Sequence, residues 1–186
     1  MRKLKLQIQT TVDGYMAGPN GEMDWMKFPW TDDIGVYVAA LMETVDCIVL
    51  GRNLAEGFIP HWAAQPADED QTSIDWMNNT PKVVLSTTLA ESPWDNAAVA
   101  SDLTEAIDEL KAQQGGDLIA YGGGMLVSSL ISAGLVDELH LFVNPTAIGT
   151  GMPVFPTDGA YRQLELVGAQ PFDCGITAMH FRPKRT

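Results

Sequence analysis

Three consecutive glycines in this sequence have a residue pattern that could bind an anion. Gly122, Gly123 and Gly124 follow the strand-like segment 117–121 and precede a helical pattern that extends to about residue 133. Glycine lets a backbone approach a ligand closely, and the free amides at a helix N-terminus attract phosphate. A tight strand-to-helix turn accounts for the same glycines equally well, so both interpretations remain open for this segment alone.

Two further segments with phosphate-binding chemistry also follow apolar runs. Gly51, Arg52 and Asn53 come after residues 47–50, and an arginine carries a planar fork of donors that suits a phosphate. Ser86 and Thr87 follow residues 82–85, where their hydroxyls and amides could hold a second side of the same phosphate. An ordinary surface arginine and a capped turn are the alternatives.

The elements that must position these segments alternate between strands and helices. Apolar patterns predict strands at 3–11, 47–50, 82–86, 117–121, 137–144, 162–169 and 176–182, and helices at 32–44, 103–113 and 124–133. Residues 53–58 start a further helix, and 60–81 are expected to be a loop with a short helix. Open α/β sheets bind ligands at the carboxyl ends of their strands, where all three segments fall, so the pattern favours a nucleotide.

Composition narrows the class of protein further. The chain has 186 residues and 46% hydrophobic content, which predicts one domain, and a net charge of −13, which argues against nucleic acid and anionic membranes as partners. Cys47 and Cys174 form no disulfide framework, and no signal peptide is apparent, so we expect reduced thiols and a cytoplasmic location. The three histidines do not cluster in sequence, and no metal site is predicted.

The order of these segments resembles the dihydrofolate reductase superfamily. It is more similar to the branch that contains the reductase domain of riboflavin biosynthesis, whose opening motif resembles residues 11–18 and 21–25, and whose later motif resembles 136–141. The resemblance covers about residues 3–182. It implies an α/β fold with a central mixed, mostly parallel sheet flanked by helices and with antiparallel C-terminal strands. It also implies a homodimer.

The resemblance further implies NADPH as cofactor and gives each segment a role. Arg52, with Gly51 and Asn53, matches the strand end near the 2′-phosphate of NADPH, and Ser86 and Thr87 match the other side of that pocket. The pyrophosphate turn and the nicotinamide contacts correspond to two further sets: Gly122, Gly123, Gly124, Met125 and Leu126 for the turn, and Thr10, Ala17 and Gly18 for the ring.

The activity implied is hydride transfer from NADPH to a carbonyl or imine carbon of a small molecule, heterocycles included. Asp32, Asp33 or a bound water would supply the proton, and a carboxylate donor needs a pKa raised by burial. Asp13, Trp25 and Phe28 are candidate substrate contacts, and Trp30 could also stack on an aromatic substrate. The alternatives are a turn-capping role for Asp13 and core packing for the aromatic side chains.

Two departures argue against the best-known substrates of these families. Dihydrofolate reductases carry an arginine for the folate carboxylate where Thr80 and Pro81 stand here, and the phosphate-bearing riboflavin precursor calls for more basic residues than this chain provides. Two alternative functions therefore stay open: a true dihydrofolate reductase with an altered folate grip, and a nucleotide-binding module without catalysis, because a fold alone does not establish a function.

Overall fold

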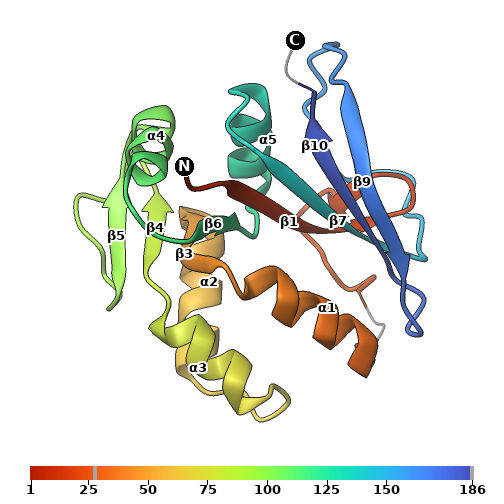
Figure 1. Cartoon of the computed structure of the whole chain (residues 1–186), viewed down its shortest axis with the longest axis horizontal. Helices are drawn as coiled ribbons and strands as arrows, with labels where there is room; N and C mark the ends of the chain where they lie inside the picture. The colour runs from red at the N-terminus through yellow and green to blue at the C-terminus, as the bar shows by residue number, and fades with distance from the viewer. Residues whose placement is uncertain (27–28, 185–186) are drawn as a thin grey trace.

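The computed structural model describes residues 1–26 and 29–184, and a single large sheet forms its centre (Figure 1). Eight strands of the described chain lie in the order β5-β4-β3-β6-β1-β7-β10-β9. Their bounds are β1 (Leu4–Thr11), β3 (Val45–Gly51), β4 (Lys82–Leu85), β5 (Ala97–Ala100), β6 (Asp117–Ala120), β7 (Glu138–Asn144), β9 (Leu164–Pro171) and β10 (Thr177–Pro183). The pairs from β5 to β7 are parallel, whereas β10 and β9 are antiparallel, which confirms the predicted class of fold.

Helices cover both faces of this sheet (Figure 1). Apolar side chains of α4 (Leu103–Ala112) and α5 (Gly124–Ser132) pack on one face against alternate residues of β1, β3, β6 and β7. On the opposite face α2 (Arg52–Ala63) packs over β3, β4 and β6, with α3 (Gln71–Asn79) beside it, and α1 (Asp32–Met42) packs over β7 and β10. The carboxyl ends of the parallel strands therefore form one edge between two helical layers, and the predicted phosphate-binding segments lie along it.

The strand β1 differs from its predicted pattern because it is central. Its alternation of apolar and polar residues is typical of a strand with one face in water. Both Lys5 and Gln7 are nonetheless buried, because the helix α1 lies over the face on which they stand. Polar side chains are thus enclosed beneath α1, and they need partners there.

The helix ends show which local signals were reliable. Asp102 caps α4 as predicted, because its carboxylate accepts a hydrogen bond from the Glu105 amide at 2.9 Å. Thr31 precedes α1 but makes no capping bond with its side chain. The prediction that irregular structure begins at residue 60 was wrong, since α2 continues through Pro60 to Ala63. The carbonyl that Pro60 leaves without a helical donor belongs to the exposed Glu56, where water can satisfy it.

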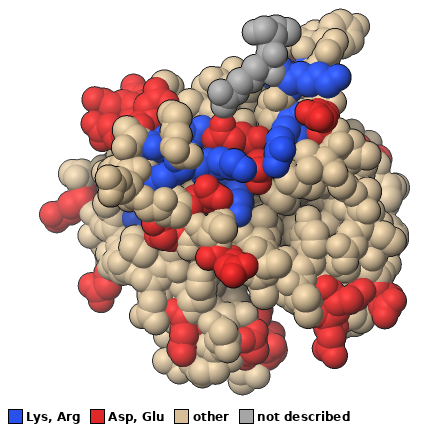
Figure 2. Space-filling view, in the orientation of Figure 1, with Lys and Arg blue, Asp and Glu red and all other residues tan. Residues whose placement is uncertain are grey.

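Basic side chains gather near the N-terminus in the view of Figure 2, with acidic atoms among them. They come from the amino ends of the central strands and from α4. Arg2 pairs with Asp46, and Lys111 with Asp137 at 2.5 Å. This region is therefore a network of internal ion pairs. Among the described residues, no helix is both long and apolar enough to cross a bilayer.

Candidate cofactor site

The N-termini of α2 and α5 meet at the carboxyl ends of β3 and β6. Gly51 precedes α2, and Gly123, with a φ of +84°, precedes α5. A Cβ atom on Gly123 would lie 3.8 Å from the Gly51 Cα, and one on Gly51 would lie 3.3 Å from the Leu126 Cβ. Neither helix has an acidic residue in its first turn, so the positive ends of both helix dipoles remain available to an anion.

Arg52 extends this anion-binding edge from α2 toward β4. Its Nη1 donates to the Thr88 hydroxyl at 2.6 Å, and its Nε donates to a Glu56 carboxylate oxygen at 2.8 Å. The side chain is 40% exposed, so the guanidinium is held in place but remains accessible. Thr88 was not among the predicted residues, although it directly follows the predicted Ser86-Thr87 pair.

Ser86 has a different role from the one that its hydroxyl suggested. It is buried, and its Oγ accepts hydrogen bonds from the amides of Thr88 and Leu89, at 3.2 and 3.1 Å. The hydroxyl therefore closes the turn after β4 and presents Thr88 to Arg52. Thr87 is exposed beside it, as is Asn53 at the start of α2.

A second wall of the site comes from the opening motif. Its short strand β2 (Tyr15–Ala17) pairs with β8 (Met152–Pro153), a two-stranded sheet that the sequence did not predict. Asp13 anchors the wall, since its Oδ2 accepts from the Gly149 amide at 2.7 Å and from the Ile148 amide at 3.1 Å. Hydrogen bonds from Thr11 and Gly149 lower the pKa of Asp13. These contacts favour an anchoring role for Asp13 over contact with substrate.

This wall touches the glycine turn. A Cβ on Gly124 would lie 3.5 Å from the Met152 sulfur and 3.9 Å from the Met16 sulfur. Both methionines were missed as site residues, because thioether side chains read as packing groups in a sequence. The run Gly149-Thr150-Gly151 after β7 was the available signal, since Gly151 approaches the Ala17 carbonyl too closely for any side chain.

The predicted nicotinamide residues belong to this wall. Thr10 is buried, with its hydroxyl 3.1 Å from the Thr11 carbonyl and 3.2 Å from the Tyr15 carbonyl, and Ala17 is also buried. The Gly18 amide donates to the Glu22 carbonyl at 2.8 Å. Of the predicted turn residues, Met125 is exposed and Leu126 is buried behind Gly51.

A carboxylate proton donor needs burial that raises its pKa, and neither Asp32 nor Asp33 is buried. Asp33 accepts hydrogen bonds from the Thr31 hydroxyl and from the Ile34 and Asp173 amides, both at 2.9 Å. The bonds from Thr31 and Asp173 lower its pKa, the opposite direction from the one required. Asp32 is exposed. Asp33 thus ties α1 to the β9–β10 turn, and a donor role for either residue stays a prediction.

The predicted aromatic contacts divide between core and surface. Trp25 is buried, which favours the packing alternative, and its indole Nε1 has no hydrogen-bond partner. Trp30 is 49% exposed and stacks on Phe142, with ring centroids 6.4 Å apart. Phe28 lies outside the described residues.

Two surface hollows lie at the opposite edge of the sheet. They have volumes of about 490 and 460 Å³, and the second is lined in part by Arg2 and Lys82. Arg2 is bound to Asp46 and the Gly116 carbonyl, and Lys82 donates to the Thr80 carbonyl at 2.8 Å. Because these cations are engaged and also buried, whereas the Arg52 side chain is 40% exposed, the hollows offer no anion site comparable to the glycine edge.

The residues at the carboxyl edge fit a nicotinamide dinucleotide. The glycine pair provides the close backbone approach and the helix dipoles that a pyrophosphate needs, and Arg52 with Thr88 provides donors for a further phosphate.

Comparison with known proteins places the chain in a family. Residues 2–178 match the RibD C-terminal domain family, and the chain belongs to that family. It is 29% identical over 180 residues to the uncharacterized protein YyaP of Bacillus subtilis, covering 94% of this chain and 92% of that protein. It is 28% identical over 157 residues to the riboflavin biosynthesis protein RibD of Corynebacterium ammoniagenes, covering 80% of this chain but 44% of that protein.

Solved structures share the same fold. A putative riboflavin biosynthesis protein from Shewanella sp. PV-4 superimposes with a TM-score of 0.77 at 24% identity, over 98% of this chain and 99% of that one. Dihydrofolate reductase from Enterococcus faecalis, solved in complex with NADP(H), gives a TM-score of 0.63 at 15% identity, over 98% and 97%. The dihydrofolate-reductase-like fold expected from the sequence is thereby confirmed.

Proposed function

We propose that this protein is an NADPH-dependent reductase of a small carbonyl or imine compound. The observation that carries the proposal is the meeting of two helix N-termini with Arg52 at one edge of the sheet. Membership of the RibD C-terminal domain family supports it, as does the fold shared with an NADP(H)-bound dihydrofolate reductase. When bound, the cofactor would supply the hydride.

The chain's own residues have three tasks in this proposal. The amides around Gly123 and Gly124 bind the pyrophosphate, and Arg52, steadied by Thr88, binds the 2′-phosphate. The wall formed by β2 and β8, with Met16 and Met152 against the glycine turn, orients the reactive ring near Thr10 and Ala17 and excludes water.

The proton would reach the product from a bound water or from Asp32 or Asp33. Asp33 is held in its ionised form by Thr31 and Asp173, so the arrangement favours water over that carboxylate. Asp32→Asn and Asp33→Asn variants test this directly, because the carboxylate version requires that at least one of them lose most of its turnover while still binding NADPH.

Calorimetric titration with NADPH and, in parallel, NADH tests the cofactor assignment. We expect NADPH to bind more tightly, and Arg52→Ala to weaken NADPH by about tenfold or more while changing NADH little, since only NADPH carries the 2′-phosphate. Arg162→Ala is the matched control, because Arg162 pairs with Asp158 on the surface. If neither nucleotide binds to the folded protein, the reductase proposal is wrong.

Turnover separates a reductase from a nucleotide-binding module without catalysis. The test supplies a panel of aldehydes, ketones and cyclic imines and follows NADPH absorbance. Consumption that depends on both substrate and Arg52 supports the enzyme. Tight NADPH binding with no consumption across the panel, dihydrofolate included, favours the binding module.

Two further parts of the proposal are a homodimer and a cytoplasmic location. The edge strand β9 supports a dimer, because Leu166 and Val167 on it are 54% and 44% exposed. Light scattering that reports a mass near 20.2 kDa, the mass of one chain, would contradict the dimer. The free Cys47 and Cys174 are consistent with a reducing compartment.

A further inference from the structure

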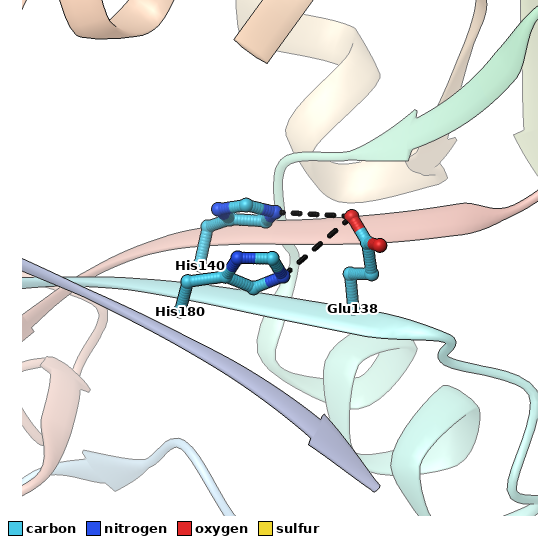
Figure 3. A group of neighbouring side chains, drawn as sticks. All are labelled: Glu138, His140 and His180. Atoms are coloured by element: carbon cyan, nitrogen blue, oxygen red, sulfur yellow. Dashed lines mark ion pairs between the residues drawn. The ribbon is translucent and has the colours of Figure 1, made fainter. Parts of the chain in front are cut away.

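Three side chains from two neighbouring strands converge on the face of the sheet that carries α1 (Figure 3). Glu138 and His140 stand two residues apart on β7, and His180 on β10 is the cross-strand partner of His140. The two imidazole rings stack, with centroids 4.2 Å apart and planes at 18°. No local sequence pattern predicts this cluster, since the β7–β10 register alone brings the two histidines together.

Both rings direct the same nitrogen at one oxygen. Each Nε2 lies 3.6 Å from the Glu138 Oε2, which is longer than a hydrogen bond. Both nitrogens are buried, and neither has a hydrogen-bond partner. Buried polar atoms are nearly always paired, so two unpaired nitrogens aimed at one buried carboxylate indicate a missing group between them.

We propose that Glu138, His140 and His180 form a binding site for one transition-metal dication of the zinc class. A ligand atom from each residue lies within 4.8 Å of the other two. Zinc bonds of about 2.0–2.2 Å place the ligands of one ion roughly 3.4 Å apart. The 3.6 Å between each Nε2 and the Glu138 Oε2 is close to that value. Two imidazoles and one carboxylate suit zinc, with a fourth position for water, whereas calcium and magnesium prefer oxygen ligands.

The surroundings prepare the ligands for such an ion. Lys3 Nζ and Arg182 Nη2 contact the other oxygen of Glu138, at 2.9 and 3.3 Å, and so orient the carboxylate with Oε2 toward the histidines. The Tyr37 hydroxyl lies 3.5 Å from Nδ1 of His140 and can hold that ring.

The same surroundings set the expected strength. Lys3 and Arg182 are positively charged, so they repel a dication and weaken its binding. Both rings must also tilt from their stacked arrangement, because the lone pair of each nitrogen lies in the plane of its ring. We therefore expect a site of moderate affinity. Removing the charge of Lys3 should strengthen it, because Arg182 still contacts the other oxygen of Glu138 and keeps Oε2 directed at the histidines.

The site would be structural. Glu138 begins β7, at the amino edge of the sheet, whereas the glycine turn lies at the carboxyl edge. A metal here would link the last parallel strand, β7, to the antiparallel strand β10. The proposal is thus independent of the proposed reduction, and binding to the folded state alone would raise its stability.

The experiment titrates the full chain, first freed of metal with a chelator, with Zn²⁺ by calorimetry and with Co²⁺ by visible absorption. We expect one ion per chain, a Co²⁺ d–d spectrum typical of nitrogen and oxygen ligands, and a higher unfolding temperature with Zn²⁺. His140→Gln and His180→Gln should each weaken binding by at least about tenfold. His61→Gln is the matched control, because His61 is an exposed histidine on α2.

Two results would overturn the proposal. The first is the absence of stoichiometric Zn²⁺ binding to the folded wild-type chain at micromolar concentrations. The second is binding that survives in the folded His140→Gln and His180→Gln variants. If those variants fail to fold, Lys3→Gln decides, since the side chain of Lys3 is 50% exposed. Tighter binding in Lys3→Gln supports the site, and unchanged or weaker binding refutes it.

Discussion

The two edges of the central sheet use polar groups in opposite ways. At the carboxyl edge, the N-termini of α2 and α5 meet at glycines with no acidic residue in either first turn. At the amino edge, buried cations are matched with carboxylates, as in Lys5 with Asp117 and Lys111 with Asp137. Buried charge that is neutralised by a carboxylate stabilises the fold. Helix N-termini without acidic residues, and the exposed ion pair of Arg52 with Glu56, can instead bind a ligand. The burial and pairing of a polar group thus distinguish structural groups from ligand-binding groups better than its residue type does.

Breaking an amino-edge pair should give the largest loss of stability. Lys111 is 7% exposed, and its Nζ contacts the Asp137 carboxylate at 2.5 Å and the Leu135 carbonyl at 2.6 Å. Lys111→Met removes the cation from both, so we expect a loss of about 3 kcal/mol in the free energy of unfolding, measured with denaturant. NADPH affinity should stay within about twofold, because the pair is far from the glycine turn.

The control for this change is Lys184→Met, an exposed lysine whose loss should cost less than about 0.5 kcal/mol. A Lys111→Met protein that kept its stability but lost NADPH binding would reverse the assignment of the two edges.

Matched glycine variants test the carboxyl edge. Gly123 and Gly134 both have positive φ angles, +84° and +67°. Alanine at either position should cost about 1–2 kcal/mol of stability, because a Cβ is strained in that region. Only Gly123→Ala should also weaken NADPH, by about tenfold or more, since a Cβ on Gly134 meets nothing within 4 Å and Gly134 ends α5 away from the turn. Equal NADPH affinities in the two variants would remove Gly123 from the cofactor site.

The order of elements could be predicted from the sequence because each rests on local patterns. Runs such as 47–50 and 118–120 are apolar throughout, and the Asp102 capping box is a local device. β5 was missed, because its alanines have little strand propensity and the strand forms by pairing with β4. What sequence could not provide was register, which comes from long-range pairing.

The candidate site residues could likewise be predicted only where they form a local pattern in the sequence. The phosphate-binding segments lie within single strand-to-helix turns, so Gly51, Arg52 and the glycine run were visible in sequence. The β2–β8 wall and the pairing of His140 with His180 join residues more than 30 apart, and no local pattern marks them. Asp13 was noticed, yet its bonds to Ile148 and Gly149 could be found only in the folded chain.

Asp33 is a carboxylate whose hydrogen-bond partners belong to the protein, so we expect it to be structural. The pH dependence of stability tests that role. Its folded pKa is lowered by Thr31 and Asp173, so its contribution to stability is present above the unfolded pKa of about 3.9. That contribution is lost as pH falls through the lower, folded pKa. Asp33→Asn should thus be less stable than wild type by a roughly constant free energy of unfolding between pH 5 and 7. This difference should become smaller below about pH 4.

Denaturant unfolding across that pH range measures the difference. Asp32→Asn, a change at the neighbouring exposed position, is the control and should follow wild type. A gap between Asp33→Asn and wild type that widened on acidification would mean that Asp33 is protonated in the folded state. The proton-donor role would then regain its support.

The smallest expected effect concerns thiol reactivity, with no change in fold or cofactor binding. Burial raises the pKa of Cys47 to about 11, so at pH 8 it stays a thiol, whereas Cys174 in the β9–β10 turn is only half-buried. Because thiolates are the reactive form, an aromatic disulfide reagent should label one cysteine of the native chain quickly and the second only on unfolding. Cys174→Ser should abolish the fast phase, and Cys47→Ser should leave it intact. Fast labelling of Cys47 would show that the amino edge opens to solvent. That edge would then be accessible, as the carboxyl edge is, and the contrast between them would be lost.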